Sequence, residues 1–170
     1  HKRGWDARWK EFSDVAEKGN DVMERLLKLV DEDTAAFARI MDVFAMPKGS
    51  DEEKAARAEA MEKATLYATQ VPLRTMKTAL EAMPVALAMA KEGNPASASD
   101  AGVGAIAALA AVRGAQLNVR INAAGLEDRA HGHGAAVDLV EGQPVFYLVL
   151  VALKDCLAVV HVELDQFPGS

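Results

Sequence analysis

The sequence has few aromatic residues, a single cysteine and no excess of basic residues. Aromatic side chains make up 5% of its 170 residues, and the net charge is −6. The lone Cys156 cannot form an internal disulfide, which excludes a disulfide-rich scaffold and fits a reducing compartment. An acidic chain lacks the basic face that nucleic acids and anionic membranes attract. We therefore expect a cytoplasmic protein with no nucleic-acid and no membrane partner.

Long apolar runs are also absent. The most apolar stretch, residues 144–162, is interrupted by Lys154 and Asp155, which leaves too few consecutive apolar residues for a membrane span of about 20. His1-Lys2-Arg3 is followed by amphipathic sequence rather than by the apolar segment of a secretory signal. Both observations agree with the expected cytoplasmic location.

Alanine is abundant, within a composition that is 51% hydrophobic. Alanine is the best helix former and is depleted in strands. Because aromatic residues are scarce, much of the core must consist of small side chains that let helices approach closely. The sequence therefore predicts an all-α fold, a helical bundle of long amphipathic helices.

Apolar residues recur at helical spacing through the first 44 residues. The first stripe consists of Trp5, Trp9, Phe12 and Ala16, and the second of Val22, Leu26, Val30, Phe37, Ile40 and Phe44. Gly19-Asn20, between them, marks either a break between two helices or an irregularity within one. Met46-Pro47-Lys48-Gly49 ends the pattern.

A second helical region is expected from Ser50 to Lys91. Ser50 and Glu53 have the spacing of a capping box, in which the serine hydroxyl and the glutamate carboxylate each accept a backbone N–H of the other residue. Pro72 and Pro84 lie inside this region, and each removes a donor, so kinks or short breaks are expected there. Gly93-Asn94-Pro95 is the expected end.

The next helix is expected to begin within residues 97–100. Its apolar stripe consists of Val103, Ile106, Ala110, Leu117 and Ile121. Small residues on another side, Gly104, Ala107, Ala111 and Gly114, predict a smooth face for close helix packing, within the chain or across a dimer.

Asp33 occupies the gap in the second apolar stripe, between Val30 and Phe37. This spacing predicts that its carboxylate points toward the core. A carboxyl group buried there must be paired or shifted toward its protonated form, and a shifted group can act as an acid or a base near neutral pH. The alternative is a structural role, in which Asp33 bonds a helix end or an arginine, or is solvated by a rotation of the helix.

Asn118 and Asn122 are four residues apart and share one helix face with Gly114. Two amides beside small residues can donate to a ligand in a cleft between helices. The alternative is an interhelical or a solvent contact.

The order of several short motifs resembles the cyclodeaminase/cyclohydrolase family. This family includes the cyclodeaminase domain of formimidoyltransferase-cyclodeaminase and the related methenyltetrahydrofolate cyclohydrolases. The resemblance extends from His1 to about Arg129. It is carried by residues 29–37 (LVDEDTAAF), 46–50 (MPKGS), 52–54 (EEK), 71–73 (VPL), 93–94 (GN), 99–100 (SD) and 118–122 (NVRIN).

The resemblance implies an all-α, dimer-forming enzyme of folate metabolism. Its reaction converts 5-formimidoyltetrahydrofolate to 5,10-methenyltetrahydrofolate with release of ammonia. Asp33 matches the second Asp of the family's V-D-x-D segment, to which catalysis is assigned. No metal and no redox cofactor is implied, because the tetrahydrofolate derivative is the substrate. A formimidoyltransferase domain or protein is the implied partner.

The carboxylates of folate require a local basic cluster on an acidic protein. The resemblance suggests Lys2 and Arg3, which occupy the place of a basic pair in related sequences. Charge alone makes Arg74, Arg113 and Arg120 equally suitable.

Both ends of the chain depart from the family pattern. The family's first helix is missing before His1, so residues 1–130 are interpreted as an N-terminally incomplete cyclodeaminase-like helical domain. Residues 131–170 carry one basic and five acidic residues and lose the helical period, which suggests an atypical tail, from an aberrant reading frame or a foreign sequence. His131 and His133, between glycines, lack the further ligands of a metal site. Two alternatives to cyclodeaminase activity stay open: cyclohydrolase activity, and an inactive fragment that serves only as a helical dimerisation module.

Overall fold

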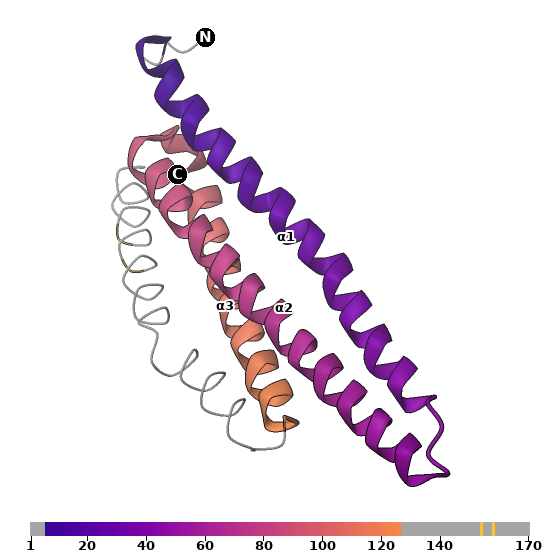
Figure 1. Ribbon diagram of the computed structural model, residues 1–170. Coiled ribbons are helices and arrows are strands. Elements are labelled where there is room, and N and C mark those ends of the chain that lie inside the picture. The colour runs from indigo at the N-terminus through magenta and orange to yellow at the C-terminus, as the bar shows by residue number, and fades with distance from the viewer. Residues whose placement is uncertain (1–5, 127–153, 155–157, 159–170) are drawn as a thin grey trace. The chain divides into compact units, whose positions relative to one another are not determined.

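The computed structural model describes residues 6–126 and the single residues Lys154 and Ala158. The described chain contains three α-helices and two short 3-10 helices, and no strand (Figure 1). The all-α prediction is confirmed. The elements in chain order are η1 (Asp6–Arg8), α1 (Trp9–Phe44), α2 (Asp51–Glu92), η2 (Pro95–Ser97) and α3 (Ala98–Ala124).

The helix α1 is continuous through Gly19 and Asn20, so the irregularity considered there does not divide it. Glycine in a helix interior costs about 1 kcal/mol relative to alanine. The Val85 side chain of α2 packs against Gly19, because a Cβ atom at position 19 would lie 3.4 Å from Cγ1 of Val85.

The capping box at the start of α2 is confirmed. The Glu53 amide donates to Oγ of Ser50 at 3.2 Å, and Oε2 of Glu53 accepts from the amides of Ser50 at 3.1 Å and Gly49 at 2.7 Å. These bonds satisfy amides at the helix start that have no partner within the helix. The sequence between the two helices therefore encodes both the turn and the start of α2.

The breaks expected at Pro72 and Pro84 are absent, since α2 is one helix from Asp51 to Glu92. Pro72 has no N–H, so the carbonyl of Ala68 loses its helical donor. The side chain of Asn122 replaces that donor, with Nδ2 lying 2.7 Å from the Ala68 oxygen. A break at Pro72 was expected because sequence reasoning could not include a donor from another helix.

The end of α2 at Gly93 is confirmed. A Cβ atom at this position would lie 2.2 Å from the Met89 oxygen, so only glycine fits without a shift of the backbone. Asn94 then caps η2, its side chain accepting from the Ala96 amide at 3.3 Å. The helix α3 begins directly after Ser97, as expected.

The described residues divide into two compact units that each contain a part of all three α-helices. Unit 1 comprises residues 6–26 and 78–111, and unit 2 comprises residues 27–77 and 112–126. In unit 2 the contacts between Arg57 and Val43 and between Arg74 and Glu32 pair rising numbers on α2 with falling numbers on α1. The two helices are therefore antiparallel within this unit.

Small side chains fill the core, as the composition predicted. Ten of the nineteen buried hydrophobic residues of the described chain are alanine. In unit 2 the buried residues of α3 include Val112, Ala115, Val119 and Ala123. Small side chains let helix backbones approach closely while keeping the interior densely packed.

The large apolar residues of α3 lie on its outer side, so the predicted stripe is not the buried one. Val103, Ile106, Leu117 and Ile121 are between 52% and 69% exposed. The predicted smooth face is also open within the chain, since Gly104 and Gly114 have nothing within 4 Å of an added Cβ atom. Pro95–Ala124 is also the one segment of the described chain that is long and apolar enough to cross a membrane, which is weak evidence because core helices of soluble proteins pass the same test.

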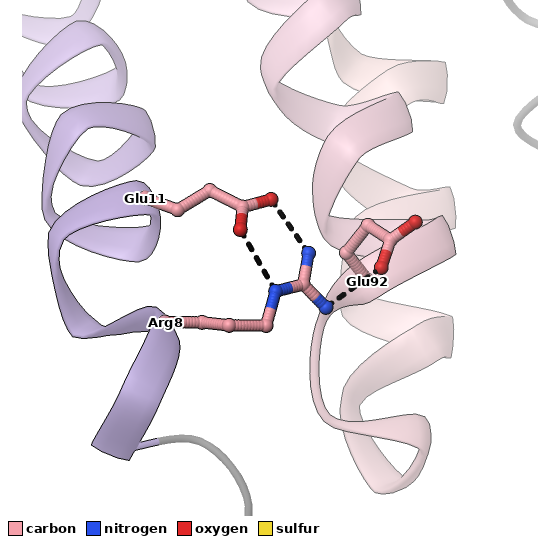
Figure 2. A network of polar contacts seen from close by, with 3 residues as sticks. All are labelled: Arg8, Glu11 and Glu92. Atoms are coloured by element: carbon pink, nitrogen blue, oxygen red, sulfur yellow. Dashed lines mark hydrogen bonds and ion pairs between the residues drawn. The ribbon is translucent and has the colours of Figure 1, made fainter.

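Ion pairs join η1 and α1 to α2 within unit 1. Arg8 pairs with Glu11 of α1 and with Glu92 of α2, and Nη1 of Arg8 lies 2.9 Å from Oε2 of Glu92 (Figure 2). Arg25 bonds Glu81, and its guanidinium lowers the pKa of that carboxyl. Such exposed pairs contribute little to stability, because solvent screens both charges.

Candidate functional site

Asp33 lies on α1 in unit 2 and is exposed, so the prediction that it points into the core is wrong. The buried line of α1 in this unit consists of Leu29, Ala36 and Val43, which are 7%, 1% and 7% exposed. Val30 and Phe37, which were expected inside, face outward. The buried line therefore lies one residue away from the predicted stripe.

The position of Asp33 is at the border between the buried line and an outward apolar stripe. It follows Leu29 by four residues and precedes Ala36 by three, and it follows Val30 by three and precedes Phe37 by four. Residues three and four apart are neighbours on a helix surface. Asp33 therefore presents a carboxylate to solvent directly beside exposed apolar side chains.

The Asp33 carboxylate makes no hydrogen bond and no ion pair within residues 6–126. The neighbouring Glu32 does, since it pairs with Arg74 of α2. The free carboxylate is available to a ligand that lies on the outward stripe. A ligand bound there would also displace water from the Asp33 carboxylate. A carboxylate on a wholly polar surface would stay hydrated.

The two asparagines of α3 differ in their surroundings. Asn122 is half-buried, and its Nδ2 atom is held by the Ala68 carbonyl. This is the interhelical contact considered as an alternative to ligand binding, and it leaves only Oδ1 of Asn122 for a ligand. Asn118, one turn earlier, is exposed. In the part of the chain that the structure describes, no hydrogen bond connects either side chain with Asp33.

Only some of the residues considered for the folate carboxylates lie within the described residues. Lys2 and Arg3 lie outside the described residues. Arg74 is engaged by Glu32, and Arg113 and Arg120 also have interactions of their own. The tail site that the resemblance suggested at Lys2 and Arg3 therefore stays a prediction.

A basic pocket that sequence reasoning missed lies in unit 2, at the turn between α1 and α2. It has a volume of about 230 Å³ and is lined by Phe44, Lys48, Lys54, Arg57, Ala58 and Met61. Lys54 and Arg57 are three residues apart in the first turns of α2, which puts them on one face. That spacing was a usable signal, but three acidic residues next to Lys54 obscured it.

The larger pocket of unit 1 has a different character. It has a volume of about 760 Å³ and lies between α1 and α2, with four acidic and two basic residues in its lining. An acidic surface repels a ligand with several carboxylates. No group of three or more His, Cys, Asp or Glu residues among the described residues is arranged to hold a metal ion.

The comparison with protein families decides the identity of the chain. The formiminotransferase-cyclodeaminase family model matches residues 1–137. The chain belongs to this family. The relatives of this chain are named as enzymes of folate one-carbon metabolism. The family is therefore one of folate-related enzymes.

Individual relatives carry two different names. The chain is 40% identical over 120 residues to a methenyltetrahydrofolate cyclohydrolase of Methylorubrum extorquens, covering 71% of this chain and 58% of that protein. It is 36% identical to formimidoyltransferase-cyclodeaminases of Mus musculus over 104 residues and of Gallus gallus over 110 residues. These matches cover 61% and 64% of this chain and 19% and 20% of the two relatives. The chain thus spans little more than half of the bacterial relative.

Proposed function

We propose that this chain converts 5-formimidoyltetrahydrofolate to 5,10-methenyltetrahydrofolate and ammonia, with Asp33 as the acid and base. The observation that carries this proposal is an unpaired, solvent-accessible carboxylate beside an exposed apolar stripe, in a chain of the formiminotransferase-cyclodeaminase family. The apolar stripe offers a surface for the rings of folate, and the carboxylate offers the proton-transfer group.

In the proposed reaction, N10 of the folate attacks the formimidoyl carbon, whose imine nitrogen is protonated. The N10–C bond forms, and Asp33 accepts the proton that N10 loses. The same group then donates this proton to the amino nitrogen, because an amine leaves only when it is protonated. The C–N bond breaks and ammonia departs. This sequence transfers protons and no electrons, so it requires no redox cofactor and no metal.

Positioning supplies a further part of the rate acceleration. The two reacting nitrogens belong to one molecule, so holding the pterin and aminobenzoyl rings in the closing geometry makes the step intramolecular. An exposed Phe37 one turn after Asp33 is suited to stack on one of these rings. Stacking there would also exclude water from Asp33.

Methenyltetrahydrofolate cyclohydrolase activity is the second candidate. It is favoured by the 40% identity to a relative of that name. In this reaction water attacks the methenyl carbon, and Asp33 would accept a proton from the water. The bond between this carbon and N5 then breaks as N5 takes up a proton, which leaves a formyl group on N10. The same carboxylate serves both reactions, so its position does not distinguish an ammonia leaving group from a water nucleophile.

The test is an assay of the chain with each substrate. Formation of 5,10-methenyltetrahydrofolate from the formimidoyl substrate, followed by its near-ultraviolet absorbance, supports the cyclodeaminase. Loss of the same absorbance from added methenyl compound, faster than without protein, supports the cyclohydrolase instead. Turnover of neither substrate would contradict both reactions and favour the dimerisation module.

We further propose that the chain acts as a homodimer and receives its substrate from a formimidoyltransferase domain or protein. The outward residues Leu117 and Ile121 of α3 in unit 2 form an apolar surface beside Gly114, where a second helix can approach closely. A second copy of α3 is the proposed occupant, because it brings the same small and apolar residues to a symmetric contact.

A further inference from the structure

The methionines of the chain differ sharply in their access to solvent. All seven lie within the described residues. Met23 and Met41, both on α1, are 51% and 50% exposed, whereas Met76 and Met83 of α2 are 3% and 2% exposed. An oxidant in solution therefore reaches the two thioethers of α1 much more readily than those of the core.

The two exposed methionines have different neighbours. Met41 lies in unit 2, follows Phe37 by four residues and precedes Phe44 by three. Residues three and four apart are neighbours on a helix surface, and both rings are exposed, Phe37 by 63% and Phe44 by 57%. Met23 lies in unit 1, and no aromatic residue stands three or four positions from it. Met41 alone of the two thus belongs to an exposed aromatic surface.

Asp33, Phe37 and Met41 form one row along α1, because each follows the previous one by four residues. Each step of this row advances about 6 Å along the helix axis. The pterin of a folate has two fused rings, so a pterin that begins at Asp33 and lies on Phe37 extends toward Met41. A thioether suits this contact, since it is apolar and polarisable and interacts favourably with aromatic rings.

We propose that Met41 is an oxidation site that regulates folate binding. Hydrogen peroxide converts its thioether to a sulfoxide, and the sulfoxide weakens the contact between the outward stripe of α1 and the folate rings. This inference rests on the proposed function, since it assumes that the rings lie on the stripe beside Asp33. It adds a control by the redox state of the solvent, which the proposed reaction itself does not require.

The modification is a two-electron transfer of one oxygen atom. A lone pair of the Met41 sulfur attacks one oxygen of hydrogen peroxide, so that an S–O bond forms and the O–O bond breaks. The sulfur is oxidised and the peroxide is reduced. The proton of the transferred oxygen passes to the departing hydroxide, which leaves as water. A ring that covers the sulfoxide strips water from a polar S–O group, and covering a polar group without a hydrogen bond is unfavourable.

Peptide mass spectrometry of the folded protein tests the modification without any substrate. During treatment with dilute hydrogen peroxide, Met23 and Met41 are expected to gain one oxygen atom each well before Met76 and Met83 do. Protection of Met41 equal to that of Met83 would overturn the inference. Circular dichroism before and after treatment confirms that the helices are intact.

Calorimetric titration then tests the effect on binding. The probe is 5-methyltetrahydrofolate, which carries both ring systems but no formimidoyl carbon, and it is added after the peroxide has been removed. Oxidation of the wild-type chain is expected to raise the Kd about tenfold. In Met41→Leu the same treatment should change the Kd of that variant by less than about twofold, whatever its starting value, because no thioether remains at position 41.

Met23→Leu is the matched control, since it removes an equally exposed thioether of the same helix. Its Kd should still rise about tenfold on oxidation. A wild-type Kd that does not respond to peroxide, or a rise that persists in Met41→Leu, would overturn the inference. Methionine sulfoxide reductase should return the Kd of the oxidised wild-type chain to its starting value.

The outcomes separate this inference from the proposed function. A wild-type chain that turns over the formimidoyl substrate equally well before and after oxidation contradicts the inference and leaves the proposed function in place. A chain without turnover whose Kd responds to peroxide through Met41 contradicts the proposed reaction and supports the inference. A chain that does not bind 5-methyltetrahydrofolate contradicts both.

Discussion

At the scale of single residues, position on a helix decides what a polar side chain does. Asp33 and Asn122 were both singled out from the sequence, but their surroundings are opposite. The carboxylate of Asp33 is exposed and unpaired within the described residues, whereas the amide of Asn122 bonds the Ala68 carbonyl. The first is available for chemistry, and the second is partly committed to the fold.

Asp33→Asn is expected to keep the fold and lose turnover. The amide is nearly isosteric but cannot accept and return a proton, so kcat should fall about 10²- to 10⁴-fold. Because the side chain is exposed, the free energy of unfolding should change by less than about 0.5 kcal/mol. Steady-state assays and urea titration measure the two quantities.

The control for this prediction is Asp31→Asn, which changes a second exposed carboxylate on the same helix. It should leave kcat within a factor of about two, because an exposed carboxylate outside the site gives no proton-transfer function. Near-normal turnover of the Asp33 variant would remove Asp33 from the mechanism.

Asn122→Ala is expected to destabilise the protein by about 1–3 kcal/mol, because the Ala68 carbonyl then has no donor from either helix. In a Pro72→Ala background the cost should be smaller, since residue 72 again supplies an N–H to that carbonyl. Chemical denaturation of the two single variants and the double variant measures this coupling.

Asn118→Ala serves as the control for that cycle. Its side chain is exposed one turn before Asn122, so its removal should change the free energy of unfolding by less than about 0.5 kcal/mol. Strictly additive effects of Asn122→Ala and Pro72→Ala would contradict the role assigned to the amide.

At the scale of helices, packing against the other helices decides which face is buried. In unit 2, α1 buries Leu29, Ala36 and Val43 and exposes Val30 and Phe37. Both sets have helical spacing, so periodicity alone fits either face. The choice between the two faces depends on the partner helices, and this is information that a single helix does not contain.

Ala36→Leu tests this packing. Position 36 is 1% exposed, and a larger side chain there should force α1 and α2 apart at a cost of about 1–3 kcal/mol. Ala35→Leu, at an exposed neighbouring position, is the matched control and should change stability by less than about 0.5 kcal/mol. Equal melting temperatures of the two variants would contradict the assigned face.

At the scale of the whole molecule, α3 exposes the apolar side chains of Leu117 and Ile121. Such surfaces usually mark an interface. The proposed second copy covers Leu117 and Ile121 and leaves the outward stripe of α1 open for folate. A membrane is the competing partner, because Pro95–Ala124 has the length and composition of a span.

Leu117→Arg combined with Ile121→Arg should convert the dimer into a monomer, because an uncompensated charge cannot be buried in an apolar contact. Light scattering during gel filtration measures the mass. Gln70→Arg, an exposed position of α2, is the control and should leave the dimer intact. A monomeric wild-type chain, or one that partitions into neutral lipid vesicles, would contradict the dimer.

Much of the architecture follows from local chemistry and was predictable. The capping box at Ser50, the end of α2 at Gly93 and the start of α3 each depend on residues within a few positions of one another. The alanine-rich core also follows, because composition limits the size of the side chains available. The continuity of α2 through Pro72 does not follow, since its compensating donor is 50 residues away.

The sequence by itself determined an all-α chain with small side chains in its core and membership of a folate-related family. It also singled out Asp33 as the candidate for proton transfer. The tertiary structure decided that Asp33 is exposed rather than buried, that Asn122 bonds a carbonyl freed by a proline, and that Lys48, Lys54 and Arg57 share a pocket. The reason is physical. Periodicity shows which residues share a face, but only the packing of helices against one another shows which face excludes water.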